Sequence, residues 1–333
     1  MDGGHSSGPS SEGTERAARA LAARAPAPAV AGNVRAGTAG WTDPTLVKLS
    51  DFYPRGVRSA QARLEHYATQ FSVVEVDATY YALVSEETAR HWAERTPQAF
   101  GFHVKAHPVV TGHPIDVARL PLDLRQAFEA AGHPVRAYPE RVPLELTTEI
   151  QARFVRSLSP LIEAKKLCAV LAQFPPWFDA SRGNARRIEA LRTRFPDLPI
   201  TVEFRHKSWL LPERRQRVLD LLRAQGFAYV VVDEPNTLVG GVPRVAEVTN
   251  EALAVVRFHG RNVSGWSRKG ASVHERFDYL YAPEELTEWR ESISRLAERA
   301  REVHVVFNNC VRDYAVVGAK GLIAAIAHAA RLE

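Results

Sequence analysis

Eight short apolar runs alternate with amphipathic stretches from residue 33 onward, and this alternation constrains the fold more than any other feature of the sequence. The runs are predicted strands, at 34–41, 73–81, 100–106, 168–176, 200–206, 228–233, 254–260 and 303–309. Helical periodicity is predicted over about 58–70, 86–96, 149–164, 183–195, 212–225, 283–300 and 313–331. Strands that alternate with helices are typical of a parallel sheet. Eight such units predict a single (β/α)8 barrel of the TIM type.

An open, doubly wound sheet that binds a dinucleotide is the alternative with the same alternation. Such a sheet needs a Gly-rich turn after its first strand, because that turn seats a pyrophosphate. The first run ends in GTAGW (37–41), which lacks G-x-G-x-x-G spacing, and no helical stretch follows it at once. The pattern therefore favours the barrel. We expect one barrel helix to be short or absent after the sixth strand, where EPNTLVGGVPRVAEVTNE (234–251) is poor in helical periodicity.

Composition is typical of a soluble globular protein with a terminal extension. Of the 333 residues, 45% are hydrophobic and 24% charged, and the formal net charge of +5 does not by itself indicate nucleic-acid or membrane binding. Residues 1–32 are rich in Gly, Ser, Ala and Pro. They predict a mostly disordered tail, with a short helix over 15–24 left open, before a domain that spans 33–333.

Cysteine content and hydropathy bear on the compartment and on cofactors. Cys168 and Cys310 are too few for a disulfide framework or a cysteine metal set, and no apolar run reaches the roughly 18 residues that cross a bilayer. We expect a cytoplasmic monomer that does not act on membranes. The cofactor is unknown: no nucleotide-cofactor motif is present, and a metal site is not predicted.

Polar side chains occur at the end of nearly every predicted strand. They are Asp77, Thr79, Lys105, Gln173, Glu203, Arg205, Asp233, Arg257, His259, Asn308 and Asn309. In a TIM-type barrel the carboxyl ends of the strands open onto the active-site face, and side chains alternate between the interior and the helices. Charged groups on a core strand are costly to bury unless they are paired. The pattern therefore predicts a polar pocket at that face.

The same alternation groups the polar residues by face. Glu203 and Arg205 share one face of their strand, while Val202 and Phe204 lie on the other. Three more groups share a face: Glu75 with Asp77 and Thr79, His103 with Lys105 and His107, and Arg257 with His259. Structural ion pairs, such as Glu203–Arg257 or Asp77–Arg205, explain single charges but explain the whole set less well. We expect one pocket lined by Glu203, Arg205, Arg257, Asp77 and Lys105.

Two connections are unusually long for a compact domain. The first, residues 107–148 after the third strand, is either a flap over the barrel mouth, with a short helix near 120–131, or a solvated insertion without a catalytic part. The second follows the seventh strand and interleaves cations with aromatic residues: Arg261, Arg268, Lys269, Arg276, Trp266, Phe277, Tyr279 and Tyr281. Such a loop can neutralise phosphates and stack on bases or sugars, although helix capping by APEEL (282–286) explains part of it.

Short motifs in this order resemble the YecE-like family, domain of unknown function 72. The motifs are GTAGW (37–41), FYP (52–54), VEVDATYY (74–81), FHVKA (102–106), AQFPP (172–176), EFRHKSW (203–209), RFHGRN (257–262), RFDYLYAPEEL (276–286) and VFNN (306–309). The resemblance covers about residues 34–331 and implies a TIM-type barrel without an established reaction. The matching positions are Gly40, Trp41, Asp77, Tyr80, Lys105, Gln173, Glu203, Arg205, Trp209, Arg257, His259, Asn308 and Asn309. The N-terminal tail and the 107–148 connection depart from the family pattern.

An enzyme that acts on a small polar or anionic substrate, phosphorylated or sugar-like, is the leading hypothesis. Candidate catalytic residues are Glu203, Asp77 and His259. Candidate substrate-binding residues are Lys105, Arg205, Arg257, Gln173, Trp41, Tyr80, Trp209, Asn308 and Asn309. For the aromatic residues, plain packing is the alternative. The sequence does not distinguish a hydrolase from an isomerase or a lyase.

Two alternatives belong to other functional classes. One is a metal-assisted phosphoesterase resembling the barrel-shaped AP endonucleases, with candidate ligands His103, His107, His259, Glu203 and Asp233. The other is a non-enzymatic module in which the long loop after the seventh strand binds a nucleotide or single-stranded nucleic acid. A nucleophile elbow, a P-loop and paired C-x-x-C motifs are absent from the sequence.

Overall fold

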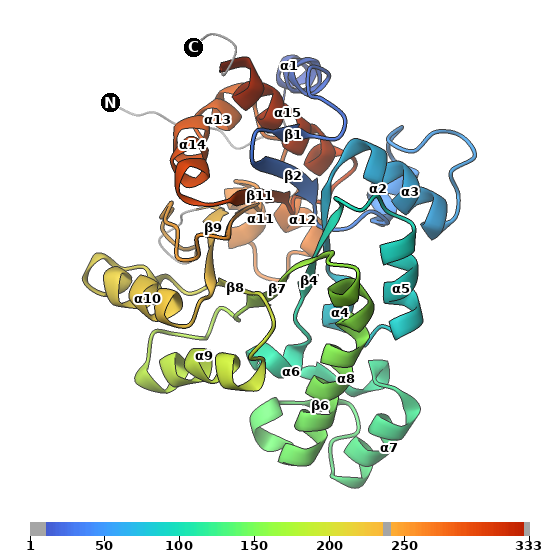
Figure 1. The fold of residues 1–333 in the computed structure, drawn as a ribbon, viewed down its shortest axis with the longest axis vertical. Helices are drawn as coiled ribbons and strands as arrows, with labels where there is room; N and C mark the ends of the chain where they lie inside the picture. Colours follow the sequence, from blue (N-terminus) through green and yellow to red (C-terminus); the bar gives the residue numbers. More distant parts are fainter. Residues whose placement is uncertain (1–10, 236–240, 330–333) are drawn as a thin grey trace. The chain divides into compact units, whose positions relative to one another are not determined.

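The computed structural model describes residues 11–235 and 241–329 and divides the chain into two compact units (Figure 1). Unit 1 consists of Met1–Val74 and Val230–Glu333, and unit 2 consists of Glu75–Tyr229. Strands β3 (Val73–Val76) and β9 (Ala228–Asp233) contain the residues at which the two units divide. No helix of the described residues is long and apolar enough to cross a membrane.

Unit 1 contains the first and the last strands of the chain. Its strands follow the order β1-β2-β11-β10-β9, with β1 (Val30–Ala31), β2 (Val34–Thr38), β10 (Leu253–Phe258) and β11 (Glu302–Phe307). The β1–β2 pair is antiparallel, and the other pairs are parallel. The helices are α1 (Glu12–Ala22), α2 (Pro44–Lys48), α3 (Ala60–Gln70), α11 (Val263–Ser267), α12 (Val273–Phe277), α13 (Pro283–Thr287), α14 (Arg290–Arg299) and α15 (Tyr314–Ala329).

Unit 2 contains the central strands in the order β9-β8-β7-β4-β3, with β4 (Gly101–Lys105), β7 (Leu167–Gln173) and β8 (Ile200–Glu203). The β4–β7, β7–β8 and β8–β9 pairs are parallel. The helices are α4 (Ala78–Tyr81), α5 (Glu86–Glu94), α6 (Pro108–Thr111), α7 (Leu122–Ala130), α8 (Leu144–Glu163), α9 (Arg182–Arg194) and α10 (Pro212–Ala224). Three short 3-10 helices cover Val117–Arg119, Pro139–Arg141 and Lys207–Trp209.

All eight predicted strands are present, and the α/β class with a mostly parallel sheet is confirmed. The run predicted over 73–81 is wrong after Val76, because Asp77 has helical backbone angles and α4 begins at the next residue. The stretch predicted as one helix over 283–300 is divided into α13 and α14. After β9 the structure has no helix in 234–235 and 241–252, as expected; residues 236–240 and 330–331 of the predicted segments lie outside the described residues.

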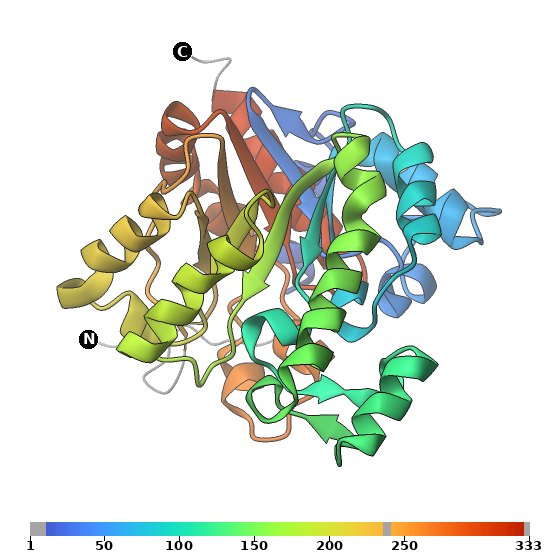
Figure 2. The ribbon, with the colours of Figure 1, turned by 60° about the horizontal axis from the view of Figure 1, so that its bottom comes forward.

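The insertion at 107–148 is a folded part of unit 2. An antiparallel pair, β5 (Ile115–Asp116) and β6 (Arg136–Ala137), flanks α7, which corresponds to the helix predicted near 120–131. Figures 1 and 2 show α7 and β6 beside the start of α8. The guanidinium of Arg153 on α8 pairs with the carboxylate of Asp123 on α7, at 2.5 and 3.0 Å. The insertion is therefore attached to α8 by an ion pair as well as by the chain.

The core of unit 1 depends on close backbone approach and on aromatic packing. A Cβ at Gly37 on β2 would lie 2.1 Å from the carbonyl oxygen of Val73, so only glycine allows this approach. The hydroxyl of Tyr67 donates to the same carbonyl at 3.2 Å and accepts from the amide of Thr38 at 2.8 Å. On β10 and β11, the Phe258 and Phe307 rings stack at 4.4 Å. These contacts place β2 beside the start of β3.

The described part of the 1–32 segment contains a packed helix that overlaps the short helix left open over 15–24. Residues 12–22 form α1, which begins at the N-cap Ser11 and lies against α15 in Figure 1. Ala18 and Ala22 are buried in a small apolar cluster with Leu280 and Val317. Arg19 adds a bidentate ion pair to Asp313, at 2.6 and 3.0 Å. The alanine-rich sequence forms a helix here because its small side chains allow close packing on α15.

Matched substitutions on α1 test whether it packs against the rest of unit 1. Ala18 is buried and Ala17 is exposed, so Ala18→Asp places a carboxylate in the apolar cluster and Ala17→Asp leaves it in water. We expect Ala18→Asp to lower the free energy of unfolding by about 1–3 kcal/mol and Ala17→Asp to change it by less than about 0.5 kcal/mol. Thermal and urea melts measure both. Equal effects of the two changes would show that α1 is not packed.

Candidate functional site

Strand register in unit 2 places three of the predicted site residues on one face of its strands. Lys105 pairs with Leu171, and Gln173 pairs with Glu203. Paired residues on parallel strands point to the same side, and residues two apart on one strand do so as well. Lys105, Gln173 and Glu203 therefore share a face, at the carboxyl ends of β4, β7 and β8. In TIM-type barrels, catalytic side chains lie at this carboxyl end of the strands.

Glu203 and Arg205 form an ion pair directly after β8. The Nη1 of Arg205 lies 3.3 Å from Oε1 of Glu203. The Glu203 carboxylate is fully buried, and the Arg205 side chain is 12% exposed. A buried carboxylate needs such a partner because desolvation otherwise disfavours its charged form. The pair gives a physical reason why the end of this core strand carries both charges.

Asp77, Tyr80 and Lys105 form a second cluster in unit 2. The Lys105 ammonium lies 3.5 Å from Oδ1 of Asp77 and 4.9 Å from the centre of the Tyr80 ring. Backbone contacts hold the pieces together, because the hydroxyl of Thr79 on α4 donates to the Lys105 carbonyl at 2.7 Å. Burial raises the pKa of Tyr80 to about 12, so its hydroxyl stays protonated at neutral pH.

His113 joins this cluster from the insertion, and the sequence patterns do not single it out. Helix α6 ends at Gly112, whose φ of +81° is a left-handed conformation that favours glycine and redirects the chain. The His113 ring then lies edge-on to Tyr80, with ring centres 5.3 Å apart. Burial and the nearby charge of Lys105 lower the pKa of His113 to about 4. The cluster thus contains a neutral imidazole beside a cation.

Two tryptophans of unit 2 differ in their surroundings. Trp209, predicted to bind substrate, is buried in a stack with Phe204 and Phe178, and its indole N–H donates to the carbonyl of Phe178 at 2.6 Å. Trp177, which the strand pattern did not single out, is 60% exposed, and its ring centre lies 5.8 Å from that of His113. The sequence signal that could have identified Trp177 is its position, because it is an aromatic residue four positions after the carboxyl end of β7.

The predicted residues of unit 1 lie at the carboxyl ends of β2, β10 and β11. His259 is buried, and the side-chain amide nitrogen of Asn308 lies 3.0 Å from its Nδ1, within hydrogen-bonding distance. The Trp266 and Phe277 rings lie 6.5 and 5.9 Å from that imidazole. Asn309 donates to the carbonyl of Tyr279 at 2.7 Å. Two further predicted residues of this unit, Arg257 and Trp41, are also buried.

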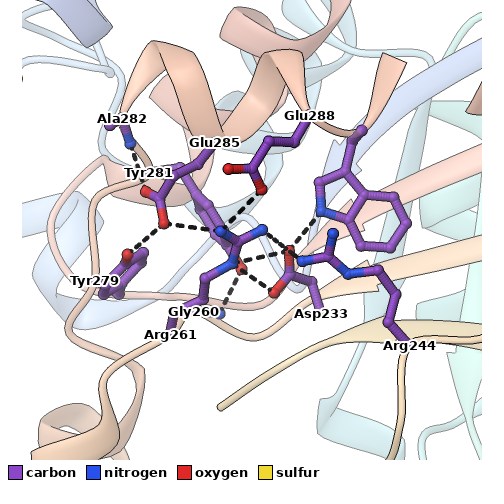
Figure 3. Close-up of polar contacts among 10 residues, drawn as sticks. Asp233, Arg244, Gly260, Arg261, Tyr279, Tyr281, Ala282, Glu285 and Glu288 are labelled. Atoms are coloured by element: carbon purple, nitrogen blue, oxygen red, sulfur yellow. Dashed lines mark hydrogen bonds and ion pairs between the residues drawn. The ribbon is translucent and has the colours of Figure 1, made fainter. Parts of the chain in front are cut away.

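A dense ion-pair network surrounds Asp233 at the end of β9 (Figure 3). The guanidinium of Arg261 donates to the Asp233 carboxylate at 2.8 and 2.9 Å, the indole N–H of Trp289 donates at 2.5 Å, and Arg244 lies at 3.4 Å. The Nη1 of Arg261 also lies 3.1 Å from Oε1 of Glu285 on α13 and 3.3 Å from Oε2 of Glu288, the residue that follows this helix. Asp233 pairs in register with Phe258, which faces Trp289, and so lies on the opposite face of the strands from Arg257.

Three of the five candidate metal ligands of the phosphoesterase alternative, Asp233, His107 and His259, have other contacts. Asp233 is surrounded by two guanidinium groups and an indole N–H, which compete with a cation for its oxygens. The Nδ1 of His107 accepts from the amide of Val109 as the N-cap of α6, and burial lowers the pKa of His107 to about 3. Nδ1 of His259 lies within hydrogen-bonding distance of the Asn308 amide nitrogen. This chemistry favours structural roles for Asp233 and His107.

Two substitutions in the Asp233 network are expected to differ sharply. Asp233→Asn removes the buried anion and leaves Arg261 without its main partner, which should cost about 3–5 kcal/mol of stability. Glu288→Gln alters a half-exposed contact at the edge of the same network and should cost less than about 1 kcal/mol. Chemical unfolding of both variants measures the difference. An Asp233→Asn variant as stable as the parent would show that this ion-pair network does not stabilise the folded protein.

Comparisons with known proteins agree with this geometry and with the motif resemblance. The family model described as "Protein of unknown function DUF72" matches residues 35–332. UPF0759 protein YunF of Bacillus subtilis is 33% identical over 276 residues, which are 82% of this chain and 87% of that protein. A DUF72 family crystal structure from Enterococcus faecalis matches with a TM-score of 0.72 and 28% identity, over 88% of this chain and 95% of that one. A DUF72 structure from Thermotoga maritima matches with a TM-score of 0.67 and 32% identity, over 87% and 97%. The chain therefore belongs to the DUF72 family.

Proposed function

We propose that the protein is an enzyme that binds a small polar, anionic substrate at the carboxyl ends of the unit 2 strands. One observation carries the proposal. The Lys105 side chain is only 14% exposed, yet within the described ranges its one ion-pair partner is Asp77, at 3.5 Å. Its ammonium has three N–H donors to satisfy, and a single carboxylate at 3.5 Å does not saturate them. A ligand carboxylate or phosphate would complete its coordination.

The groups around Lys105 supply acid–base chemistry next to a bound anion. Asp77 is 29% exposed, so its carboxylate is accessible to a substrate. Glu203 lies on the same face of the strands as Lys105, held by Arg205. Carboxylates placed in this way serve as general acids or bases, typically with a contribution of about 10²–10⁴-fold in rate. Asp77 and Glu203 are the proposed catalytic residues, and Lys105 and Arg205 the proposed anion-binding residues.

The long loop after β10 offers less support for the nucleic-acid alternative. Arg268 pairs with Glu275, and Arg261 pairs with Asp233 and Glu285. Cations that already have carboxylate partners release fewer counterions when they meet a phosphate, so they add little to nucleic-acid affinity. We therefore retain the small-ligand proposal.

We also propose that the sheet closes into a (β/α)8 barrel. Eight parallel strands follow one another with helices between most of them, and the contact of Gly37 with Val73 in unit 1 is the kind of approach that closes a barrel.

Anion binding tests the functional proposal directly. Inorganic phosphate should bind the protein at low ionic strength, and Lys105→Met should raise its dissociation constant about 10- to 100-fold, because a charge-assisted hydrogen bond is lost. Asp77→Asn should tighten binding, since it removes a neighbouring negative charge. Lys48→Met, at an exposed lysine of α2, is the matched control and should have no effect. Calorimetric titration measures all four proteins, and equal affinities for the parent and Lys105→Met would refute the site.

A further inference from the structure

We propose that the insertion after β4 completes the Lys105 site and that its ligand is a phosphorylated sugar. In this arrangement Lys105 binds the phosphate, Trp177 stacks on the apolar face of the sugar ring, and His113 exchanges hydrogen bonds with a sugar hydroxyl. The inference rests on the proposed function, because it assigns a ligand class to the same site. It also answers whether the 107–148 connection takes part in binding.

The first step is that the side chains from Trp177 to Asp77 lie next to one another in a continuous series. Ring centres of Trp177 and His113 lie 5.8 Å apart, those of His113 and Tyr80 lie 5.3 Å apart, and the Lys105 ammonium lies 4.9 Å from the Tyr80 centre. Asp77 follows Lys105 at 3.5 Å. These residues form one row, which runs from an exposed indole to a partly exposed carboxylate. All of them belong to unit 2.

The second step is the state of the His113 imidazole. Its Nδ1 lies 2.8 Å from the Thr111 hydroxyl, and among the residues that the structure describes no hydrogen bond to its Nε2 is formed. Burial, together with the nearby charge of Lys105, lowers the pKa of His113 to about 4, so the ring is neutral at physiological pH. A neutral imidazole does not compete with Lys105 for the anion. It can exchange a hydrogen bond with an uncharged hydroxyl instead.

The third step is the exposure of Trp177. The indole is 60% exposed, whereas the neighbouring Phe178 ring is buried and stacks on Phe174 at 4.1 Å. Pro175 and Pro176 precede it, and the amide of Phe178 donates to the Pro175 carbonyl at 3.0 Å. The backbone that carries Trp177 is thus fixed by a tight turn and a buried ring. An exposed aromatic face in the same row of side chains as a cation suits a ligand that has both an apolar ring face and an anionic group.

Titrations with three ligands separate this inference from the anion site itself. The ligands are inorganic phosphate, glucose 6-phosphate and ribose 5-phosphate. For the parent protein, at least one sugar phosphate should bind about five- to tenfold more tightly than phosphate, because stacking adds to the ionic contact. Trp177→Ala should remove that advantage and leave phosphate affinity unchanged, while Trp177→Phe should keep most of it. Tyr138→Ala, at another exposed aromatic residue of unit 2, is the control and should change nothing.

Chemical modification of His113 provides a second measurement. Diethyl pyrocarbonate reacts with neutral imidazole, and the lowered pKa of His113 keeps its ring neutral and reactive at pH 5. The bound sugar phosphate should protect it, as read by mass spectrometry.

Three results would overturn the inference. They are equal affinities for phosphate and both sugar phosphates, a Trp177→Ala variant that keeps the sugar advantage, and His113 modification that ignores the bound ligand. Phosphate binding that does not depend on Lys105 would instead overturn the proposed function, and this inference with it.

Discussion

The Asp233 carboxylate in unit 1 shows how this chain keeps charge inside a folded domain. It is buried, and it accepts hydrogen bonds from Arg261 and from the indole of Trp289, while Arg244 lies at 3.4 Å. Through these donors the end of β9 is joined to the segment after β10 and to the helical segment around α13. Removing such an anion costs more than the same anion contributes relative to an apolar residue, since its partners would be left desolvated. The charges that end the strands must therefore be paired or placed near solvent.

Lys105 in unit 2 is a charge at a strand end that the protein does not pair as fully as Asp233. Its ammonium has one carboxylate at 3.5 Å, and an aromatic face lies near it. Asp233 has its lone pairs filled by protein donors, whereas Lys105 keeps donors available. Active sites depend on groups of the second kind, which are held in place but not saturated by the protein. This contrast, more than the presence of charge itself, supports our proposal that the row from Asp77 to Trp177 is the functional part of unit 2.

Much of the fold could be predicted from the sequence, because apolar runs and helical periodicity report burial directly. All eight strands follow from that pattern, and the face shared by Lys105, Gln173 and Glu203 follows from alternation along each strand. The sequence leaves helix α1 open over 15–24 and does not predict it firmly, because an Ala-rich composition is common to disordered tails and to helices that pack closely. His113 and Trp177 were missed because tertiary packing brings them together. His113 reaches the cluster only through the left-handed turn at Gly112, and no local pattern reports that position.

A crystal soaked in tungstate tests the central claim most directly, since tungsten scatters anomalously and the oxyanion imitates phosphate. The account predicts an anomalous peak within hydrogen-bonding reach of the Lys105 ammonium, on the side shared with His113, and its loss in crystals of Lys105→Met. Peaks confined to exposed arginines, with none beside Lys105, would contradict the proposal that the unit 2 strand ends form an anion-binding enzyme site.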